Sequence, residues 1–152
     1  MSIPYATATS GAKARDEVVK MLRVFGCESV GFMDDFENGA VILAFKHHGR
    51  PVQLRASAQG WAAMYLKAQK YKNHRGPQKV REDERKALAQ GLIAVNSILR
   101  DWVKGQITAV ETGMLSFNAV FLPYMLASDG RPVVEHLMQS GLVPALEDKS
   151  NG

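Results

Sequence analysis

The sequence has one cysteine, no long apolar run and a long stretch without any acid, and each absence excludes a class of protein. The single cysteine, Cys27, excludes a disulfide within the chain and fits a reducing compartment. No run reaches the roughly 18 apolar residues that a bilayer-spanning helix needs, so we expect no membrane partner. The first residues, MSIPYATATSGAKARDE, lack the apolar core of a signal peptide. We therefore expect a cytoplasmic protein.

Spacings typical of a metal site are also missing. His47 and His48 are adjacent, so in a strand they point to opposite faces and do not easily share one metal ion. The zinc spacings C-x-x-C and H-x-x-x-H do not occur around the histidines and Cys27. Cys27 follows the end of a predicted helix, where the helix dipole raises a thiol pKa, so we interpret it as a core residue rather than a nucleophile. We expect neither a metal nor a cofactor.

Catalytic motifs are equally scarce. The chain has no glycine-rich phosphate-binding motif and no nucleophile elbow. Asp34, Asp35 and Glu37 form an acidic cluster that resembles part of a nuclease metal site, but they flank the Asn38-Gly39 turn, where solvated carboxylates are common. Lys46 also lacks the acid two residues earlier that a nuclease core requires. A nuclease is therefore an alternative to be tested, and we expect no enzyme activity.

Acidic residues are absent between Asn38 and Arg81. These 44 residues carry nine Lys and Arg side chains and no Asp or Glu, although the net charge of the whole chain is only +4. The rest of the chain holds ten Lys and Arg against fifteen Asp and Glu. Such segregation predicts one basic face that meets a polyanion.

The first half of the chain has strong local patterns. Val18, Leu22 and Phe25 share one face of a helix predicted over 12–25, and Gly26 is a typical helix stop. Three β-prone runs follow, at 29–36, 40–47 and 51–57. Asn38-Gly39 is a strong hairpin signal between the first two. The middle run is apolar on both faces, as expected of a strand covered on two sides, or on one side by a partner. These patterns predict a three-stranded antiparallel meander.

The second half is predicted to be helical. Ser57 is expected to cap a helix over 58–68 whose apolar stripe consists of Trp61, Met64, Tyr65 and Ala68. A basic loop over 69–81 follows, broken by Gly76-Pro77. A long helix then begins near the acids Glu82 to Glu84, with an apolar stripe from Leu88 to Val110. Two further helices are expected, one over 116–126 that is kinked or starts near Pro123, and one after the turn at 129–132.

The fold class predicted from this order is α+β, with an N-terminal helix, a three-stranded antiparallel β-meander and about four helices in one compact domain. We expect a flexible arm over 1–10, a single domain over 11–146 that contains the basic loop 69–81, and a flexible tail over 147–152. The apolar middle strand and the long stripe also leave room for a homo-oligomer.

The basic block is the candidate site. The residues predicted to contact nucleic acid are Lys46, Arg50, Arg55, Lys67, Lys70, Tyr71, Lys72, His74, Arg75, Lys79 and Arg81. Cations that follow a phosphate backbone, together with aromatic rings that stack bases, are typical of single-strand binding. Arg55 precedes the Ser57 cap, so helix N–H groups nearby would complete a phosphate site. Trp61 and Tyr65 have the spacing of core residues, which leaves Tyr71 as the aromatic best placed to stack. Two other interpretations stay open, a solvated basic loop and a protein-docking surface.

Part of the sequence resembles a family of small phage and prophage proteins. The resemblance lies in KARDEVVKMLRVFGCESVGFM, AVILAFKHHGRPVQLRAS and the stretch from GLIAVNSILRDW to the Asp-Gly-Arg turn. The shared features are an aromatic-Gly pair after the first helix, an aromatic-x-x-x-Gly-Arg-x-Val run, a Glu-x-Gly stretch and the turn, here Phe25-Gly26, Phe45 to Val52, Glu111 to Gly113, and Asp129 to Arg131. The family has no known activity, so the resemblance assigns no site residue. It implies a phage genome in a bacterial cytoplasm.

Two functions follow as hypotheses. The first is a small phage-type accessory protein that binds DNA or RNA through the basic block 38–81, for single-strand binding or annealing. The alternative is a protein-binding inhibitor or modulator of a bacterial defence or host complex, in which the basic block mimics or occludes a nucleic-acid partner.

Overall fold

A computed structural model of the chain describes residues 3–69 and 76–144. The first element, α1 (Gly11–Phe25), is the predicted amphipathic helix, and it buries Ala14, Val18 and Leu22. The hydroxyl of Ser10 accepts a hydrogen bond from the Lys13 N–H and so caps the first turn. Gly26 ends the helix with φ of 108°, a left-handed conformation that glycine adopts without strain.

The predicted meander is confirmed. Strands β1 (Ser29–Asp35), β2 (Ala40–His47) and β3 (Arg50–Ser57) form one antiparallel sheet in the order β1-β2-β3. The register joins Phe32 to Leu43 and Leu43 to Leu54, so these three side chains share the inner face. The alternation of side chains then directs Ala44 and Lys46 to the outer face, where both are exposed.

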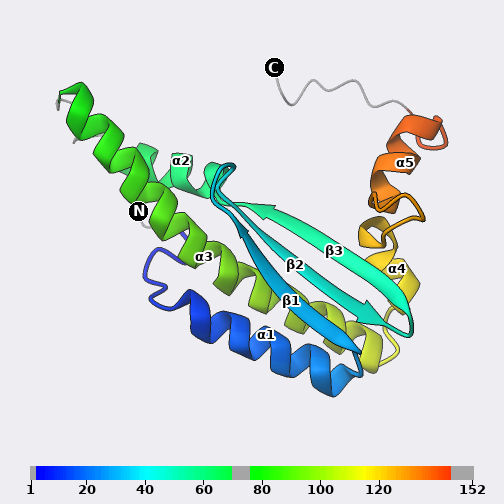
Figure 1. Ribbon diagram of the computed structural model, residues 1–152. Helices are drawn as coiled ribbons and strands as arrows, with labels where there is room; N and C mark the ends of the chain where they lie inside the picture. The colour runs from blue at the N-terminus through cyan, green and yellow to red at the C-terminus, as the bar shows by residue number, and fades with distance from the viewer. Residues whose placement is uncertain (1–2, 70–75, 145–152) are drawn as a thin grey trace.

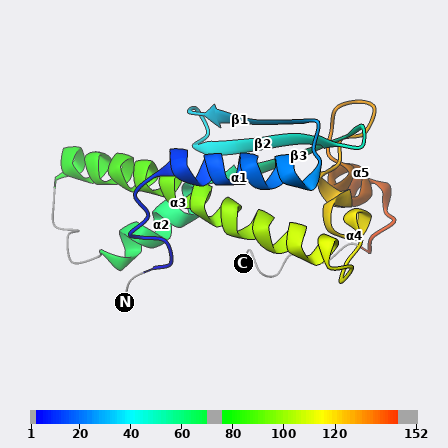
Figure 2. The same ribbon diagram turned by 90° about the horizontal axis from the view of Figure 1, so that it is seen from below.

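The sheet and the helices form two layers. Figure 2 shows the sheet as one layer above α1 and the helix α3 (Pro77–Glu111), with no helix on its other side. Within the described chain, the apolar middle strand is therefore covered on one face only. The core lies between the layers and is built from Val18, Leu22, Leu43, Phe45, Val52, Leu54, Val103, Ile107 and Phe121.

The boundaries of the next two helices differ from the prediction. Helix α2 (Gln59–Ala68) has Ala58 rather than Ser57 at its N-cap. Its buried contacts are made by Ala58 and Ala62, while the predicted stripe residue Met64 is 55% exposed. Helix α3 begins at Pro77, so residues 77–81 are helical and do not belong to a loop. Proline is favoured at a first helical position, because it has no N–H to leave unpaired there.

The C-terminal part closes one end of the sheet. Ser116 caps α4 (Phe117–Phe121), the short 3-10 helix η2 (Leu122–Tyr124) follows at the predicted proline, and α5 (Val133–Ser140) is the last described helix. The Leu126 N–H donates to the carbonyl of Pro51, 2.9 Å away, which attaches this part to β3. The α+β fold is thus confirmed. No helix in the described ranges is long and apolar enough to cross a membrane.

Candidate functional site

The structure separates the predicted cations into two groups. Lys46 and Arg50 lie at the β2–β3 turn, beside α4, whereas Lys67, Lys79 and Arg81 lie at the far end, where α2 ends and α3 begins (Figure 1). The two groups of cations do not form one continuous face. The antiparallel strands place the β2–β3 turn at the opposite end of β3 from the start of α2, and α2 packs on the half of α3 that is remote from α4. Lys70, Tyr71, Lys72, His74 and Arg75 lie outside the described residues, and their role stays a prediction.

Two of the predicted arginines bind other side chains of the protein. The Arg55 guanidinium donates to the carboxylate of Asp35. The Asn38 side chain and Arg55 lower the pKa of Asp35 to about 2, so this carboxylate stays charged and balances Arg55. Arg50 donates to the side-chain oxygen of Asn118, 2.6 Å away. The Gln59 N–H of the next helix is already bonded to the Ser57 hydroxyl. A phosphate group at Arg55 would therefore have to compete with Asp35, and the predicted phosphate site there stays a prediction.

The remaining described cations of the predicted site lie in the last turn of α2 and in the first turns of α3, the next helix along the chain. We call Lys67, Lys79 and Arg81 the hairpin-end cations. All three are exposed. The Lys79 ammonium lies 3.7 Å from the carboxylate of Glu82, while Lys67 and Arg81 have no ion-pair partner among the described residues.

Small residues allow α2 to pack closely on α3. A Cβ atom on Gly91 would lie 3.1 Å from the carbonyl oxygen of Ala58, so glycine is what allows α2 to approach α3 this closely. Trp61 stacks on Tyr65 with ring centroids 5.3 Å apart, and its indole N–H donates to the carbonyl of Pro4. These two rings are half-buried and make contacts within the protein, as their helical spacing suggests.

The acidic cluster does not converge. Asp34 accepts two hydrogen bonds from Arg15, a residue of α1, whereas Asp35 faces Arg55 and Asn38 on the other side of the sheet. Neighbouring strand residues point to opposite faces, so the two carboxylates are held apart. In the described ranges, no three histidine, cysteine or acidic side chains come together as metal ligands would.

His47 is a buried histidine with a clear structural role. Its ring stacks on Phe25 and on Phe117, at centroid distances of 4.5 and 4.7 Å, and these two rings are 6.2 Å from each other. The Sγ of Cys27 is 3.9 Å from its Nδ1, and burial raises the pKa of that thiol to about 11. Cys27 is thus protonated near neutral pH. This agrees with its interpretation as a core residue, although the raised pKa comes chiefly from burial rather than from the helix dipole.

A pH dependence follows from His47. Burial, and then the charge of His48, lower the pKa of His47 in the folded state. The unfolded chain binds the proton near pH 6.5, so the stabilisation is complete above that pH and is lost as the pH falls toward the folded pKa. We expect the urea midpoint to fall between pH 7 and pH 5, and to fall less in His47→Phe, which keeps the stack but does not titrate. Equal pH dependence in the two proteins would exclude His47 as the cause.

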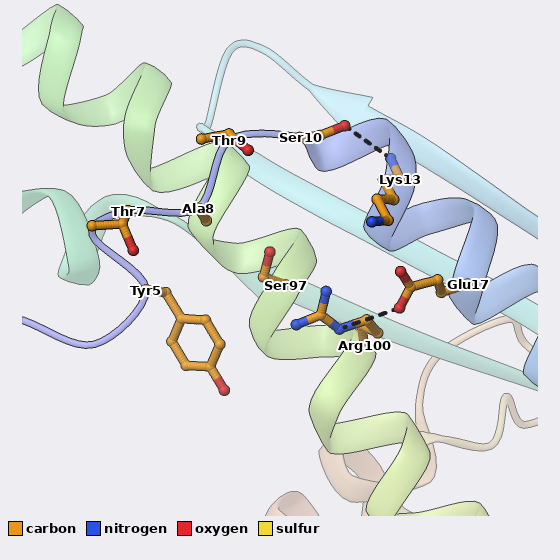
Figure 3. Close-up of a pocket in the computed structure, with 9 residues that line it drawn as sticks. All are labelled: Tyr5, Thr7, Ala8, Thr9, Ser10, Lys13, Glu17, Ser97 and Arg100. Carbon is orange, nitrogen blue, oxygen red and sulfur yellow. Dashed lines mark hydrogen bonds and ion pairs between the residues drawn. The ribbon is translucent and has the colours of Figure 1, made fainter.

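A polar pocket is the feature that the sequence does not predict. Its volume is about 450 Å³, and it lies between the N-terminal segment, α1 and α3 (Figure 3). Tyr5, Thr7 and Thr9 come from the first of these, Lys13 from α1 and Arg100 from α3. No periodic pattern marks it, because its residues are joined only by the tertiary fold.

The segment predicted as a flexible arm forms one wall of this pocket. The Tyr5 hydroxyl donates to a carboxylate oxygen of Asp101, 2.6 Å away, and the Gln90 side chain donates to the carbonyls of Ala6 and Ala8. Tyr5 also has a positive φ of 66°, which is uncommon outside glycine. Residues 3–10 therefore have specific partners on α3 that the sequence does not reveal.

Comparison with known proteins gives no relative: no protein-family model, no curated protein and no solved structure matches the chain significantly.

Proposed function

We propose that the chain binds single-stranded nucleic acid through its hairpin-end cations and the basic residues between them in the sequence. The observation that carries the proposal is the exposure of Lys67 in the last turn of α2 and of Lys79 and Arg81 in the first turns of α3, two of them with no described ion-pair partner. The chain between α2 and α3 adds Lys70, Lys72 and Arg75 and no acid. Exposed cations such as Lys67 and Arg81 suit phosphate groups, which such side chains neutralise with release of counterions.

The proposed site differs from the one predicted from the sequence. Arg50 and Arg55 are left out, because each is bonded to a side chain of the protein. Lys46 is left out because it lies at the opposite end of the sheet. Tyr71 remains the proposed stacking residue, and a site of this kind suits single-strand binding or annealing in a phage-infected bacterial cell.

The test is the dependence of affinity on salt. Each phosphate contact on a single strand contributes a slope of about −0.7 to the plot of log affinity against log salt concentration. At least three contacts from Lys67, Lys79 and Arg81 give an expected slope of about −2 or steeper. Fluorescence anisotropy with a labelled single strand measures it, with a duplex of the same sequence in parallel. A slope near zero, or no binding, would refute the proposal.

A protein partner is the second candidate, and the exposed edge of the sheet favours it. β1 is an edge strand of the sheet, and Met33 and Phe36 at its end are 63% and 82% exposed. An edge with exposed apolar side chains is suited to pairing with another chain, including a second copy. Such a protein would act as an inhibitor or modulator of a bacterial defence or host complex. Absent nucleic-acid binding in the salt titration would favour this candidate.

A further inference from the structure

The polar pocket contains unused hydrogen-bond donors on Arg100. The Nε of Arg100 donates to Asp101 at 3.0 Å and lies 3.7 Å from the carboxylate of Glu17. Its two terminal nitrogens have no partner among the described residues, and Figure 3 shows them directed toward the centre of the pocket. The two carboxylates hold the guanidinium in place, which leaves its outer edge available for an oxyanion.

Ser97 adds a hydroxyl group to the lining of this pocket. The residue is only 6% exposed, yet its hydroxyl has no partner in the described part of the chain. Figure 3 shows the hydroxyl pointing into the pocket, one helical turn before Arg100. Thr108 and Thr112 of the same helix instead donate to carbonyls four residues earlier, at 2.7 and 2.8 Å. No buried side-chain oxygen or nitrogen of the described chain lacks a partner, so the Ser97 hydroxyl is open to the pocket, where a bound group can reach it.

Lys13 adds a second cation from the opposite wall. It lies in the first turn of α1, where the Ser10 hydroxyl accepts its backbone N–H at 3.1 Å. Its ammonium has no ion pair with any described residue, and Figure 3 shows its side chain beside the pocket. Two cations and one serine hydroxyl thus converge from two helices. Glu17 is the only acid among the residues that line this pocket in the described chain.

We propose that this pocket binds a small phosphate monoester that carries hydroxyl groups. A phosphate monoester carries close to two negative charges, which match the two cations Arg100 and Lys13, and its three terminal oxygens can accept from both cations and from Ser97. The volume of about 450 Å³ lies in the range of small-molecule sites and leaves room beyond the phosphate. Glu17 accepts a ligand hydroxyl, and the Tyr5 ring forms a wall. This site is separate from the hairpin end and does not depend on the proposed nucleic-acid binding.

Isothermal titration calorimetry on the full chain tests the proposal with four probes: adenosine monophosphate, ribose 5-phosphate, adenosine and inorganic phosphate. We expect both monoesters to bind, inorganic phosphate to bind more weakly, and adenosine not to bind. Binding of both monoesters with similar affinity means that the phosphate and sugar are recognised, whereas a preference for the nucleotide assigns the extra space to the base. No heat with either monoester at millimolar concentration, or equal binding of adenosine, would overturn the proposal.

Variants locate the binding. Lys13→Met removes a side chain that has no described partner, so the fold is expected to persist while affinity falls about 10-fold or more, as for a lost charge-assisted hydrogen bond. Ser97→Ala is expected to weaken binding by a smaller factor. Lys20→Met, on the same helix and outside this pocket, is the matched control and should bind as the wild type does. Equal affinity in Lys13→Met and the wild type would contradict the assignment, as would an equal loss in Lys20→Met.

Discussion

Replacement of Lys67, Lys79 and Arg81 by glutamine is expected to lower the affinity for a single strand about 100-fold at 0.1 M salt. At that concentration each lost phosphate contact costs about fivefold in affinity, because the slope per contact is about −0.7. Three lost contacts multiply to roughly two orders of magnitude and make the slope about two units shallower. The thermal midpoint should hardly change, because all three side chains are exposed and, among the described residues, only Lys79 has an ion-pair partner.

The matched control changes the same net charge elsewhere. Lys20, Arg23 and Lys104 are exposed residues of α1 and α3, and glutamine at all three sites also lowers the formal charge from +4 to +1. If binding were caused by net charge alone, the two triple variants would lose affinity equally. We expect the control to stay within a few-fold of the wild type. Equal losses would refute a localised site, and unchanged binding in the first variant would remove the hairpin-end cations from it.

Phe121→Ala is expected to lower the free energy of unfolding by about 3–5 kcal/mol, the usual range for a buried aromatic ring. The side chain is fully buried, and its ring contacts Phe45 and Trp102 edge-on at centroid distances of 5.5 and 6.0 Å. It therefore joins α4 to both the sheet and α3. Most domains have only about 5–15 kcal/mol of stability, so this loss is a large share of the total.

Urea unfolding followed by circular dichroism measures this loss. Leu122→Ala is the control, because it changes the next residue, which is 44% exposed. We expect its effect to be below about 1 kcal/mol, as for most surface substitutions. Similar losses in the two variants would mean that α4 is not anchored by the Phe121 ring.

Local patterns were enough to predict the first half of the fold. The stripe Val18, Leu22 and Phe25 with Gly26 after it, and the Asn38-Gly39 turn, act within a few residues of each other. Helix α3 was placed a few residues too late. Gly76-Pro77 was interpreted as a break in structure, although it is the start of the helix. Lys79 and Arg81 oppose the helix dipole there, but Glu82 lies near both Lys79 and Lys86 and offsets part of that cost.

The candidate site depends more on distant partners, and there the prediction was less accurate. Arg55 looks free in the sequence, but the sheet brings it to Asp35, 20 residues away. The polar pocket needs Lys13 and Arg100 on two packed helices, and nothing in either local sequence marks such a contact. What the sequence did predict was the surplus of positive charge in the block, which composition alone reveals.

The wall of the pocket has a consequence for the order in which the protein folds during synthesis. Pro4 is joined to Trp61, Ala6 to Gln90 and Tyr5 to Asp101, so the partners are separated by 57, 84 and 96 residues. Residues 4–6 can therefore reach all three partners only after most of α3 has been made. Closing such large loops is slow, so α1 and the meander have time to form before the wall closes. The pocket is therefore completed late in folding, after the elements that form its other walls.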